Sequence, residues 1–283
     1  MSPKRALVLA GGGVAGIAWE LGVLRGIQEV DKDLAADLVT ADVIVGTSAG
    51  SAVAGQITSG TALEDLYAAQ LAETSSEIEV DFDVESFTER FASAVAGATA
   101  PEEMRRRIGA LALATPTVEE SARRVAIAAR LPVHAWPDQA VLLTAVDAET
   151  GELTIFTRES GVPLVDAVAA SCAVPGIWPP VTIDGRRYVD GGVRSVANAD
   201  LASGCDKVLV IAPMSAETPT PWDNLDQEIE LLRPAEVQAV YADASSLAAF
   251  GSNPLSPATR GPSARAGRAI GQARAADLAR FWD

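Results

Sequence analysis

The sequence predicts an α/β fold in which a largely parallel sheet is covered by helices on both faces. Short apolar runs typical of buried strands alternate with longer amphipathic stretches typical of helices. Glycine-rich turns connect the first two predicted strands directly to helices. The chain of 283 residues, with 48% hydrophobic and 21% charged residues, is long enough to bury one sizeable core. We therefore expect a single domain over residues 1–283.

The N-terminal part of the chain begins with a predicted strand, RALVLA, at residues 5–10. The glycines of GGGVAG follow, and then an apolar-periodic helix through IAWELGVLRGIQEV. Residues 42–46 form the second predicted strand. The next helix starts after Ser48 and runs to about Ser59, and LEDLYAAQLAE predicts a further helix.

Residues 73–138 differ from the flanking sequence because they carry much of the charge and show no strand alternation. Three amphipathic stretches predict helices there, and Pro101 and Pro116 stand where helices could start. We therefore expect a helical insertion at approximately residues 73–138. Its apolar faces either line a channel or lid at a binding site, or simply cover the sheet.

The second half of the chain returns to strands at AVLLTAVDA and ELTIFT. A helix in PLVDAVAASCAVPGIWPP precedes the hairpin VTIDGRRYVDGG, which turns on Asp184 and Gly185. KVLVIAPM predicts the last buried strand. We expect the C-terminal third to be helical, from RPAEVQAVYADASSLAAF to SARAGRAIGQARAADLARFW.

The composition limits the function and the location of the protein. A net charge of −16 argues against a nucleic-acid partner and against strong attraction to an anionic membrane, although transient contact with a membrane surface remains open. Cys172 and Cys205 fit a reducing compartment, and one histidine with two distant cysteines offers no metal-ligand spacing. The N-terminal apolar run is too short for a signal peptide, so we expect a cytoplasmic protein. Oligomeric state is left open.

The first candidate site is the loop GGGVAG, in which Gly11, Gly13 and Gly16 match G-x-G-x-x-G between a strand and a helix. Backbone amides of such a loop can bind dinucleotide phosphates or stabilise an oxyanion. A dinucleotide site also requires an acidic residue at the end of the next strand, and VIVGTSAG offers none there. We therefore favour an oxyanion hole, with a dinucleotide-binding protein or a plain tight turn as alternatives.

The second candidate is GTSAG, which matches G-x-S-x-G. Glycines on both sides of Ser48 allow a strand to turn sharply into a helix, which lifts the serine hydroxyl out of the sheet. The helix N-terminus favours negative charge near that hydroxyl. The alternative interpretation is a serine that caps the helix.

A nucleophilic serine needs a base, and the chain contains a single histidine, His134, in a predicted loop between Pro132 and Pro137. Asp190, in YVDGGV, is the other candidate base. A carboxylate can act on a serine if burial raises its pKa toward the working pH. The alternatives are an ordinary Asp-Gly turn at Asp190 and a structural or surface role for His134.

The glycine loop, GTSAG and the Asp-Gly-Gly motif occur in an order that resembles the patatin-like phospholipase family, and the similarity extends to ASCAVPGIWPPV. The resemblance covers roughly residues 5–60 and 140–215. It implies a three-layer α/β/α fold and hydrolysis of lipid acyl esters without a cofactor. It also implies a Ser48–Asp190 dyad, and an oxyanion hole formed by Gly11, Gly12, Gly13 and Gly16, with Gly12 and Gly13 as the main donors.

The loop departs from the family at one position. Many members carry Arg or Lys just before the last glycine, whereas this chain has Ala15, which keeps the backbone donors but removes a side-chain charge. The run Arg105–Arg107 could contact a phosphate head group or form a solvated helix face. A non-catalytic lipid-binding protein of the same fold is the second functional interpretation.

Overall fold

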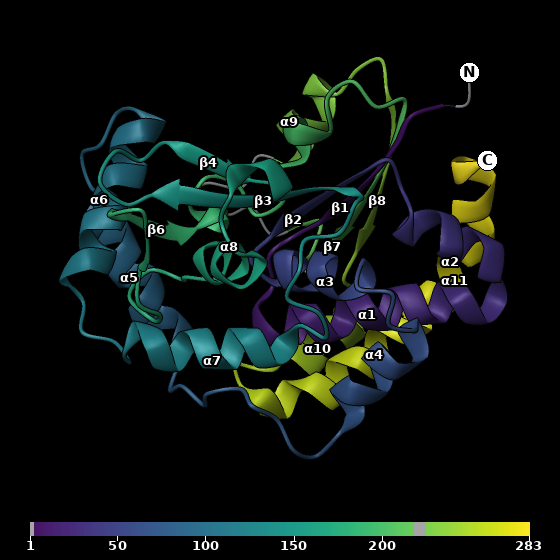
Figure 1. Ribbon diagram of the computed structural model, residues 1–283, viewed down its shortest axis with the longest axis horizontal. Coiled ribbons are helices and arrows are strands. Elements are labelled where there is room, and N and C mark those ends of the chain that lie inside the picture. The colour runs from purple at the N-terminus through teal and green to yellow at the C-terminus, as the bar shows by residue number, and fades with distance from the viewer. Residues whose placement is uncertain (1–2, 218–224) are drawn as a thin grey trace.

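The computed structural model describes residues 3–217 and 225–283, and eight strands of this part form one mixed sheet with helices on both faces (Figure 1). Parallel pairing joins β8, β7, β1, β2 and β3 in that order, and β4, β5 and β6 pair antiparallel at the β3 end. The predicted three-layer α/β/α fold with a largely parallel sheet is confirmed. The strands are β1 (Arg5–Leu9), β2 (Val43–Thr47), β3 (Ala140–Asp147), β4 (Leu153–Phe156), β5 (Val181–Ile183), β6 (Arg186–Asp190), β7 (Lys207–Ala212) and β8 (Glu236–Tyr241).

The helices divide between the two faces because successive side chains of each strand point to opposite sides. Leu7 and Leu9 of β1 join the core beneath α1, α3 and α8, whereas Ala6 and Val8 join a second core beneath α9. The α-helices are α1 (Gly13–Val30), α2 (Lys32–Val39), α3 (Ala49–Ile57), α4 (Leu63–Leu71), α5 (Val84–Val95), α6 (Pro101–Ala114), α7 (Glu120–Arg130), α8 (Leu164–Ser171), α9 (Leu225–Leu231), α10 (Ala244–Phe250) and α11 (Arg260–Trp282). Among the described helices, none is both long and apolar enough to cross a membrane.

Strand β3 has neighbours on both edges, and this arrangement positions the candidate site. β2 pairs with residues 140–144 of β3 and β6 with residues 145–147, whereas β4 pairs with residues 143–146 and so occupies the other edge. β2 runs parallel to β3 and β6 runs antiparallel, so their last residues meet. Thr47 lies opposite Thr144, and Asp190 lies opposite the next residue, Ala145.

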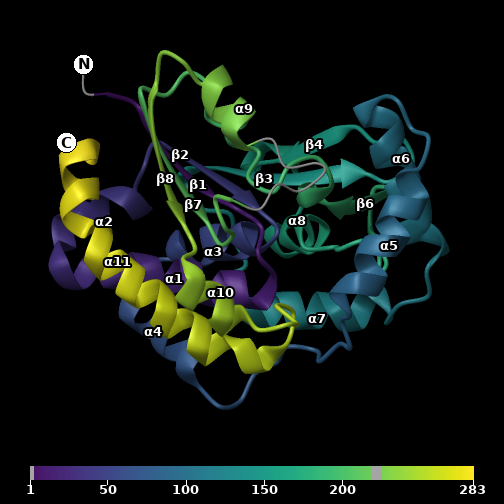
Figure 2. The ribbon, with the colours of Figure 1, turned by 180° about the vertical axis from the view of Figure 1, so that it is seen from behind.

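Helices α1 and α11 lie against each other although they come from opposite ends of the described chain (Figure 2). Glycines make this close approach possible. A Cβ atom on Gly267 would lie 2.1 Å from the Trp19 carbonyl oxygen, and a Cβ atom on Gly22 would lie 2.2 Å from the Ala264 carbonyl oxygen. The backbones of the two helices therefore pack directly on each other, with no side chain between them at these points.

Two predictions about the secondary structure were wrong. Residues 236–241 form strand β8 beside β7, so the C-terminal third is not wholly helical and KVLVIAPM is not the last strand. Most side chains of EVQAVY are only half-buried at this sheet edge, so the segment lacks the apolar run of an interior strand. Pro116 does not open a helix, because α7 begins at Glu120.

Helices α5, α6 and α7 lie within the segment predicted as a helical insertion, and Pro101 occupies the first turn of α6 as expected. Side chains from α5 and α6 form a separate apolar cluster with Val146 of β3 and Val189 of β6. The segment therefore covers the antiparallel end of the sheet. That it is an insertion into a smaller domain stays a prediction.

Candidate active site

Ser48 lies at the sharp turn between the end of β2 and the start of α3. Its backbone has φ 52° and ψ −113°, a conformation that costs a non-glycine residue on the order of 1–3 kcal/mol. A Cβ atom on Gly50 would lie 2.0 Å from the Leu9 carbonyl oxygen, and one on Gly46 would lie 2.7 Å from the Gly50 carbonyl oxygen. These glycines allow the turn to pack tightly on β1, as the G-x-S-x-G pattern requires.

The Ser48 hydroxyl does not cap helix α3, so the alternative interpretation of the motif does not apply. Other groups hold the turn instead. The Ser48 amide donates to Ser171 Oγ at 2.9 Å, and the Ser48 carbonyl oxygen accepts from Ser51 Oγ at 2.6 Å and from Cys172 Sγ at 3.1 Å. Hydrogen bonds from α3 and α8 therefore hold the strained backbone of Ser48. The Ser48 hydroxyl is not used to hold the turn.

Asp190 ends β6 beside Ser48, and only 4% of it is exposed. Its Oδ1 accepts a hydrogen bond of 2.7 Å from the Gly192 amide, and its Oδ2 is buried without a partner at standard hydrogen-bond geometry among the described residues. Burial raises the pKa of Asp190 from 3.8 to about 7, although the nearby Ser48 hydroxyl, the Gly192 amide and the Arg123 charge oppose the shift. A carboxyl group with this pKa can accept and return a proton near neutral pH.

The glycine loop lies at the N-terminus of α1 and lines the same pocket as Ser48. The Gly11 amide donates to the Val196 carbonyl oxygen at 2.8 Å, and the Gly16 amide donates to the carbonyl oxygen of Gly12, the N-cap of α1, at 2.9 Å. The amides of Gly12 and Gly13 have no acceptor among the described residues. Of the four glycines predicted for an oxyanion hole, the geometry thus leaves Gly12 and Gly13 with free donors.

A pocket of ≈290 Å³ opens beside Ser48 and Asp190. Apart from the two candidate catalytic residues, its walls are the glycine loop and Gly192 together with apolar side chains. These apolar side chains are Phe87, Phe91, Ile108, Val174, Pro175, Val193 and Val196. Helices α5 and α6 supply the first three of them, so the charged segment 73–138 contributes apolar surface to the site.

Other residues singled out from the sequence lie apart from this pocket. His134 is exposed, and its Nε2 lies 3.0 Å from the Ala128 carbonyl oxygen, so it is not positioned as a base for Ser48. Arg105 Nε donates to the Gly151 carbonyl oxygen at 2.6 Å, and Arg107 bonds to Glu103. None of the arginines at positions 105–107 lines the space around Ser48.

Several residues at the site were missed by the sequence analysis. Ser171 and Cys172 lie in ASCAVPGIWPPV, so the resemblance of this segment could have drawn attention to them. Arg123, which lines a recess beside Ser48, stands in an amphipathic helix and carried no signal in the sequence. Within residues 3–217 and 225–283, no cluster of three or more His, Cys, Asp or Glu side chains could hold a metal ion.

A family model described as patatin-like phospholipase matches residues 7–203 of the chain. The matched range contains the glycine loop, Ser48 and Asp190. It therefore includes every residue that forms the candidate catalytic geometry.

Three solved structures are similar to the chain at low sequence identity. VipD from Legionella pneumophila is 14% identical with a TM-score of 0.42, over 88% of this chain and 53% of that chain. The type III effector protein ExoU is 17% identical with a TM-score of 0.44, over 98% and 53%. Full-length ExoU in complex with SpcU from Pseudomonas aeruginosa is 14% identical with a TM-score of 0.38, over 94% and 53%. This chain thus spans about half the length of each.

Proposed function

Because the chain belongs to the patatin-like phospholipase family, we propose that it hydrolyses acyl esters of lipids, with Ser48 as the nucleophile and Asp190 as the base. One observation carries this proposal. A serine on a strained turn between strand and helix lies beside a buried carboxyl group whose pKa is about 7. A serine hydroxyl is a weak nucleophile until a neighbouring base accepts its proton, and Asp190 meets that requirement without a histidine.

In the acylation step, Asp190 accepts the hydroxyl proton while Ser48 Oγ attacks the carbonyl carbon of the ester. The amides of Gly12 and Gly13 donate to the negatively charged oxygen of the tetrahedral intermediate. The bond to the alcohol then breaks, and Asp190 returns the proton to the departing oxygen. A water molecule deprotonated by Asp190 hydrolyses the acyl-serine, which releases the fatty acid and restores the Ser48 hydroxyl. No cofactor takes part in these steps.

The acyl chain would occupy the apolar pocket next to Ser48. Its volume of ≈290 Å³ falls just below the lower end of the range usual for small-molecule sites, ~300–1,000 Å³, and the pocket is open on one side. Phe87, Phe91 and Ile108 offer the non-polar contact that makes transfer of an acyl chain from water favourable. Such substrates would be drawn from lipid aggregates through transient contact with their surface.

The proposal is tested by hydrolysis of a short-chain nitrophenyl ester and by labelling with a fluorophosphonate. We expect the wild type to turn over the ester and to be labelled once, at Ser48. Ser48→Ala and Asp190→Asn should each lose activity by a factor of about 10³ or more, while remaining folded by circular dichroism. His134→Ala should retain activity, because His134 lies on an exposed loop.

Two results would contradict the proposal. Loss of activity in His134→Ala would require a histidine base and a different site geometry. A folded wild type that neither cleaves esters nor reacts with the fluorophosphonate would favour a non-catalytic lipid-binding protein.

A further inference from the structure

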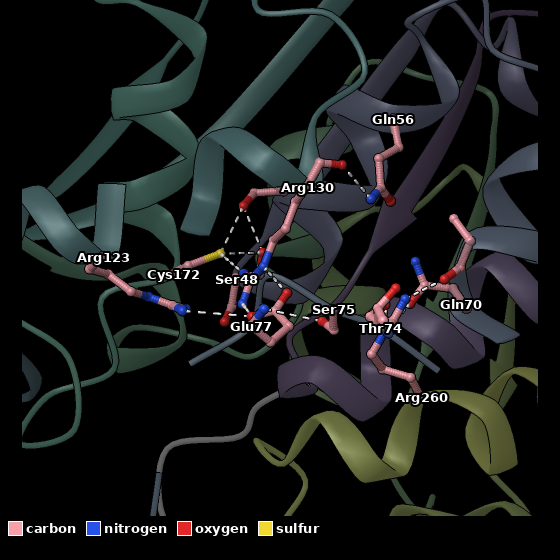
Figure 3. Close-up of polar contacts among 12 residues, drawn as sticks. Ser48, Gln56, Gln70, Thr74, Ser75, Glu77, Arg123, Arg130, Cys172 and Arg260 are labelled. Atoms are coloured by element: carbon pink, nitrogen blue, oxygen red, sulfur yellow. Dashed lines mark hydrogen bonds and ion pairs between the residues drawn. The ribbon is translucent and has the colours of Figure 1, made fainter. Parts of the chain in front are cut away.

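Two arginines of α7, Arg123 and Arg130, extend toward a single carboxylate, Glu77, beneath Ser48 (Figure 3). Glu77 comes from the chain between α4 and α5, and all three side chains are at least nine-tenths buried. Charged groups are rarely buried to this extent unless they are paired. The two arginines therefore share one carboxylate, and the hydrogen bonds show which of them Glu77 binds more closely.

Arg130 is the arginine that binds Glu77 closely, through both carboxylate oxygens. Its Nε and Nη2 donate to the two carboxylate oxygens, each at 2.6 Å, in a bidentate arrangement. Burial acts to raise the pKa of Glu77, but Arg130 and Arg123 more than offset it and keep the pKa below its usual value. Glu77 thus stays ionised, and the cluster contains two positive charges and one negative charge.

Arg123 forms only a long ion pair with Glu77 and has no hydrogen bond at its Nε or Nη1. Its Nη1 lies 3.8 Å from Glu77 Oε2, which is too long for a hydrogen bond, and its buried Nε and Nη1 have no acceptor among the described residues. The guanidinium lies on the ring of Trp178, with its carbon 3.7 Å from the ring centroid. Stacking fixes the plane of the group and uses none of its N–H donors.

The recess that Arg123 lines also borders Ser48. Its other walls include Gly13, Arg130 and Trp178, and it adjoins the apolar pocket, with which it shares Ser48 and Gly13. Its volume of ≈10 Å³ admits one oxygen-sized group, so a larger ligand would extend from it into the open site. Within the described part of the chain, Arg123 and Arg130 are the only cationic side chains that line these two spaces.

An ester at Ser48 has an acyl side and an alcohol side, and the two spaces differ in the same way. The apolar pocket suits the acyl chain, and the cationic recess suits an anion on the alcohol. Resting on the proposed function, we propose that Arg123 binds a phosphate oxygen of the alcohol moiety and so selects acyl esters of glycerol phosphate. A guanidinium with free N–H groups matches phosphate oxygens in charge and geometry.

A competing role for Arg123 is to support the ionised form of Asp190, because its positive charge lowers the Asp190 pKa. The two roles affect different measurements. A charge that acts only on Asp190 changes the hydrolysis of every ester to the same extent and shifts the pH profile. A phosphate-binding group changes the preference between an ester that carries phosphate and one that does not.

The test compares 1-acylglycerol 3-phosphate with the 1-monoacylglycerol that has the same acyl chain, both in the same neutral detergent micelles. We expect the wild type to prefer the phosphate ester in kcat/KM, and Arg123→Gln to reduce that preference by about tenfold or more. Arg123→Lys should lose less, because it keeps the charge but not the planar group. The matched control is Arg124→Gln, whose half-exposed side chain bonds to Asp166 at 2.5 Å, and it should keep the wild-type preference.

An unchanged preference in folded Arg123→Gln would overturn the inference while the proposed function stands. If that variant does not fold, two other measurements test the inference. One is the substrate preference of Arg123→Lys, and the other is the inhibition of monoacylglycerol hydrolysis by inorganic phosphate in that variant and in the wild type. Weaker inhibition and a reduced preference in Arg123→Lys support the inference. Inhibition without any preference for the lipid phosphate in the wild type would indicate a site for free phosphate and overturn it. A wild type that cleaves no ester, the nitrophenyl ester included, overturns the proposed function itself.

Discussion

The hydroxyl oxygens of Thr47 and Thr144 lie 2.9 Å apart, at the point where β2 and β6 meet along β3. Asn198 Nδ2 reaches both of them, at 3.1 and 3.4 Å, and also donates to the Ser195 carbonyl oxygen at 2.7 Å. All three side chains are fully buried. This polar cluster links the strand end that carries Ser48 to the segment that follows Asp190, and so helps to set the distance between the two proposed catalytic groups.

Replacing Thr144 with valine should therefore affect both stability and catalysis. The variant keeps the volume of the side chain but leaves Thr47 and Asn198 with fewer buried partners, which costs about 1–3 kcal/mol. We expect a lower urea midpoint and a reduced kcat with little change in KM. Thr154→Val, on the neighbouring β4, is the matched control because the Thr154 hydroxyl bonds to none of the described residues. Equal effects of the two substitutions would rule out a special role for the cluster.

The pH dependence of ester hydrolysis should report the protonation of Asp190. The carboxylate must be ionised to accept the Ser48 proton, so kcat/KM should rise with pH and reach half its maximum near the Asp190 pKa of about 7. His134→Ala should show the same profile. A midpoint that stays near pH 4 would contradict the assignment of a buried carboxyl base.

The contribution of Asp190 to the stability of the protein should fall over the same pH range. The unfolded chain releases the Asp190 proton near pH 3.8, whereas the folded protein holds it until about pH 7, so the unfolded state binds fewer protons between these values. Ionisation of Asp190 therefore favours unfolding as the pH rises from about 4 to 7. Asp190→Asn removes this cost, and we expect it to be more stable than the wild type at pH 8 but not at pH 3.5. Urea unfolding at the two pH values measures the difference.

Acyl-chain preference should depend on the volume of the apolar pocket. Ile108 of α6 is buried at its wall, so Ile108→Trp fills the space in which a long acyl chain would lie. The ratio of kcat/KM for nitrophenyl laurate to that for nitrophenyl butyrate should fall by about tenfold. Leu113→Trp lies on the same helix at a side chain that is 40% exposed, and it should leave the ratio unchanged. A parallel loss in both variants would place the acyl chain elsewhere.

Close packing of α11 on α1 predicts a large effect of one added methyl group. In Gly267→Ala the new Cβ would lie 2.1 Å from the Trp19 carbonyl oxygen, so the helices must separate, at a cost of at least about 1–3 kcal/mol. Gly261→Ala, in the first turn of the same helix, meets only the flexible end of Arg265 at 3.4 Å. It should be neutral or slightly stabilising. Thermal unfolding of the two variants compares them directly.

The sequence predicted the parts of the fold that depend on local patterns. The glycines on both sides of Ser48 and the Asp184-Gly185 pair favour particular backbone conformations. The strand-to-helix turn and the hairpin turn could therefore be predicted from the sequence. Strand β8 could not be predicted in this way, because most of its residues are half-buried at a sheet edge and pair with β7 only in the folded chain.

The electrostatic environment of the site could not be predicted either. Arg123 occupies one turn of a charged helix, and nothing local distinguishes it from its exposed neighbour Arg124. Its burial depends on Trp178, far along the chain, and its lack of a hydrogen bond to Glu77 depends on which arginine that carboxylate binds more closely. The meeting of β2 and β6 along one edge of β3 likewise depends on strand pairing that the separate motifs do not contain.

The packing of α11 on α1 also bears on how the protein is made. Helix α1 begins at the glycine loop of the site, and the partner that covers its glycines is not synthesised until residues 260–282. A nascent chain therefore exposes an apolar helix surface and an incompletely supported loop until residues 260–282 have left the ribosome. Segments of the chain that end before residue 260 would therefore leave the glycines of α1 uncovered and be prone to aggregate.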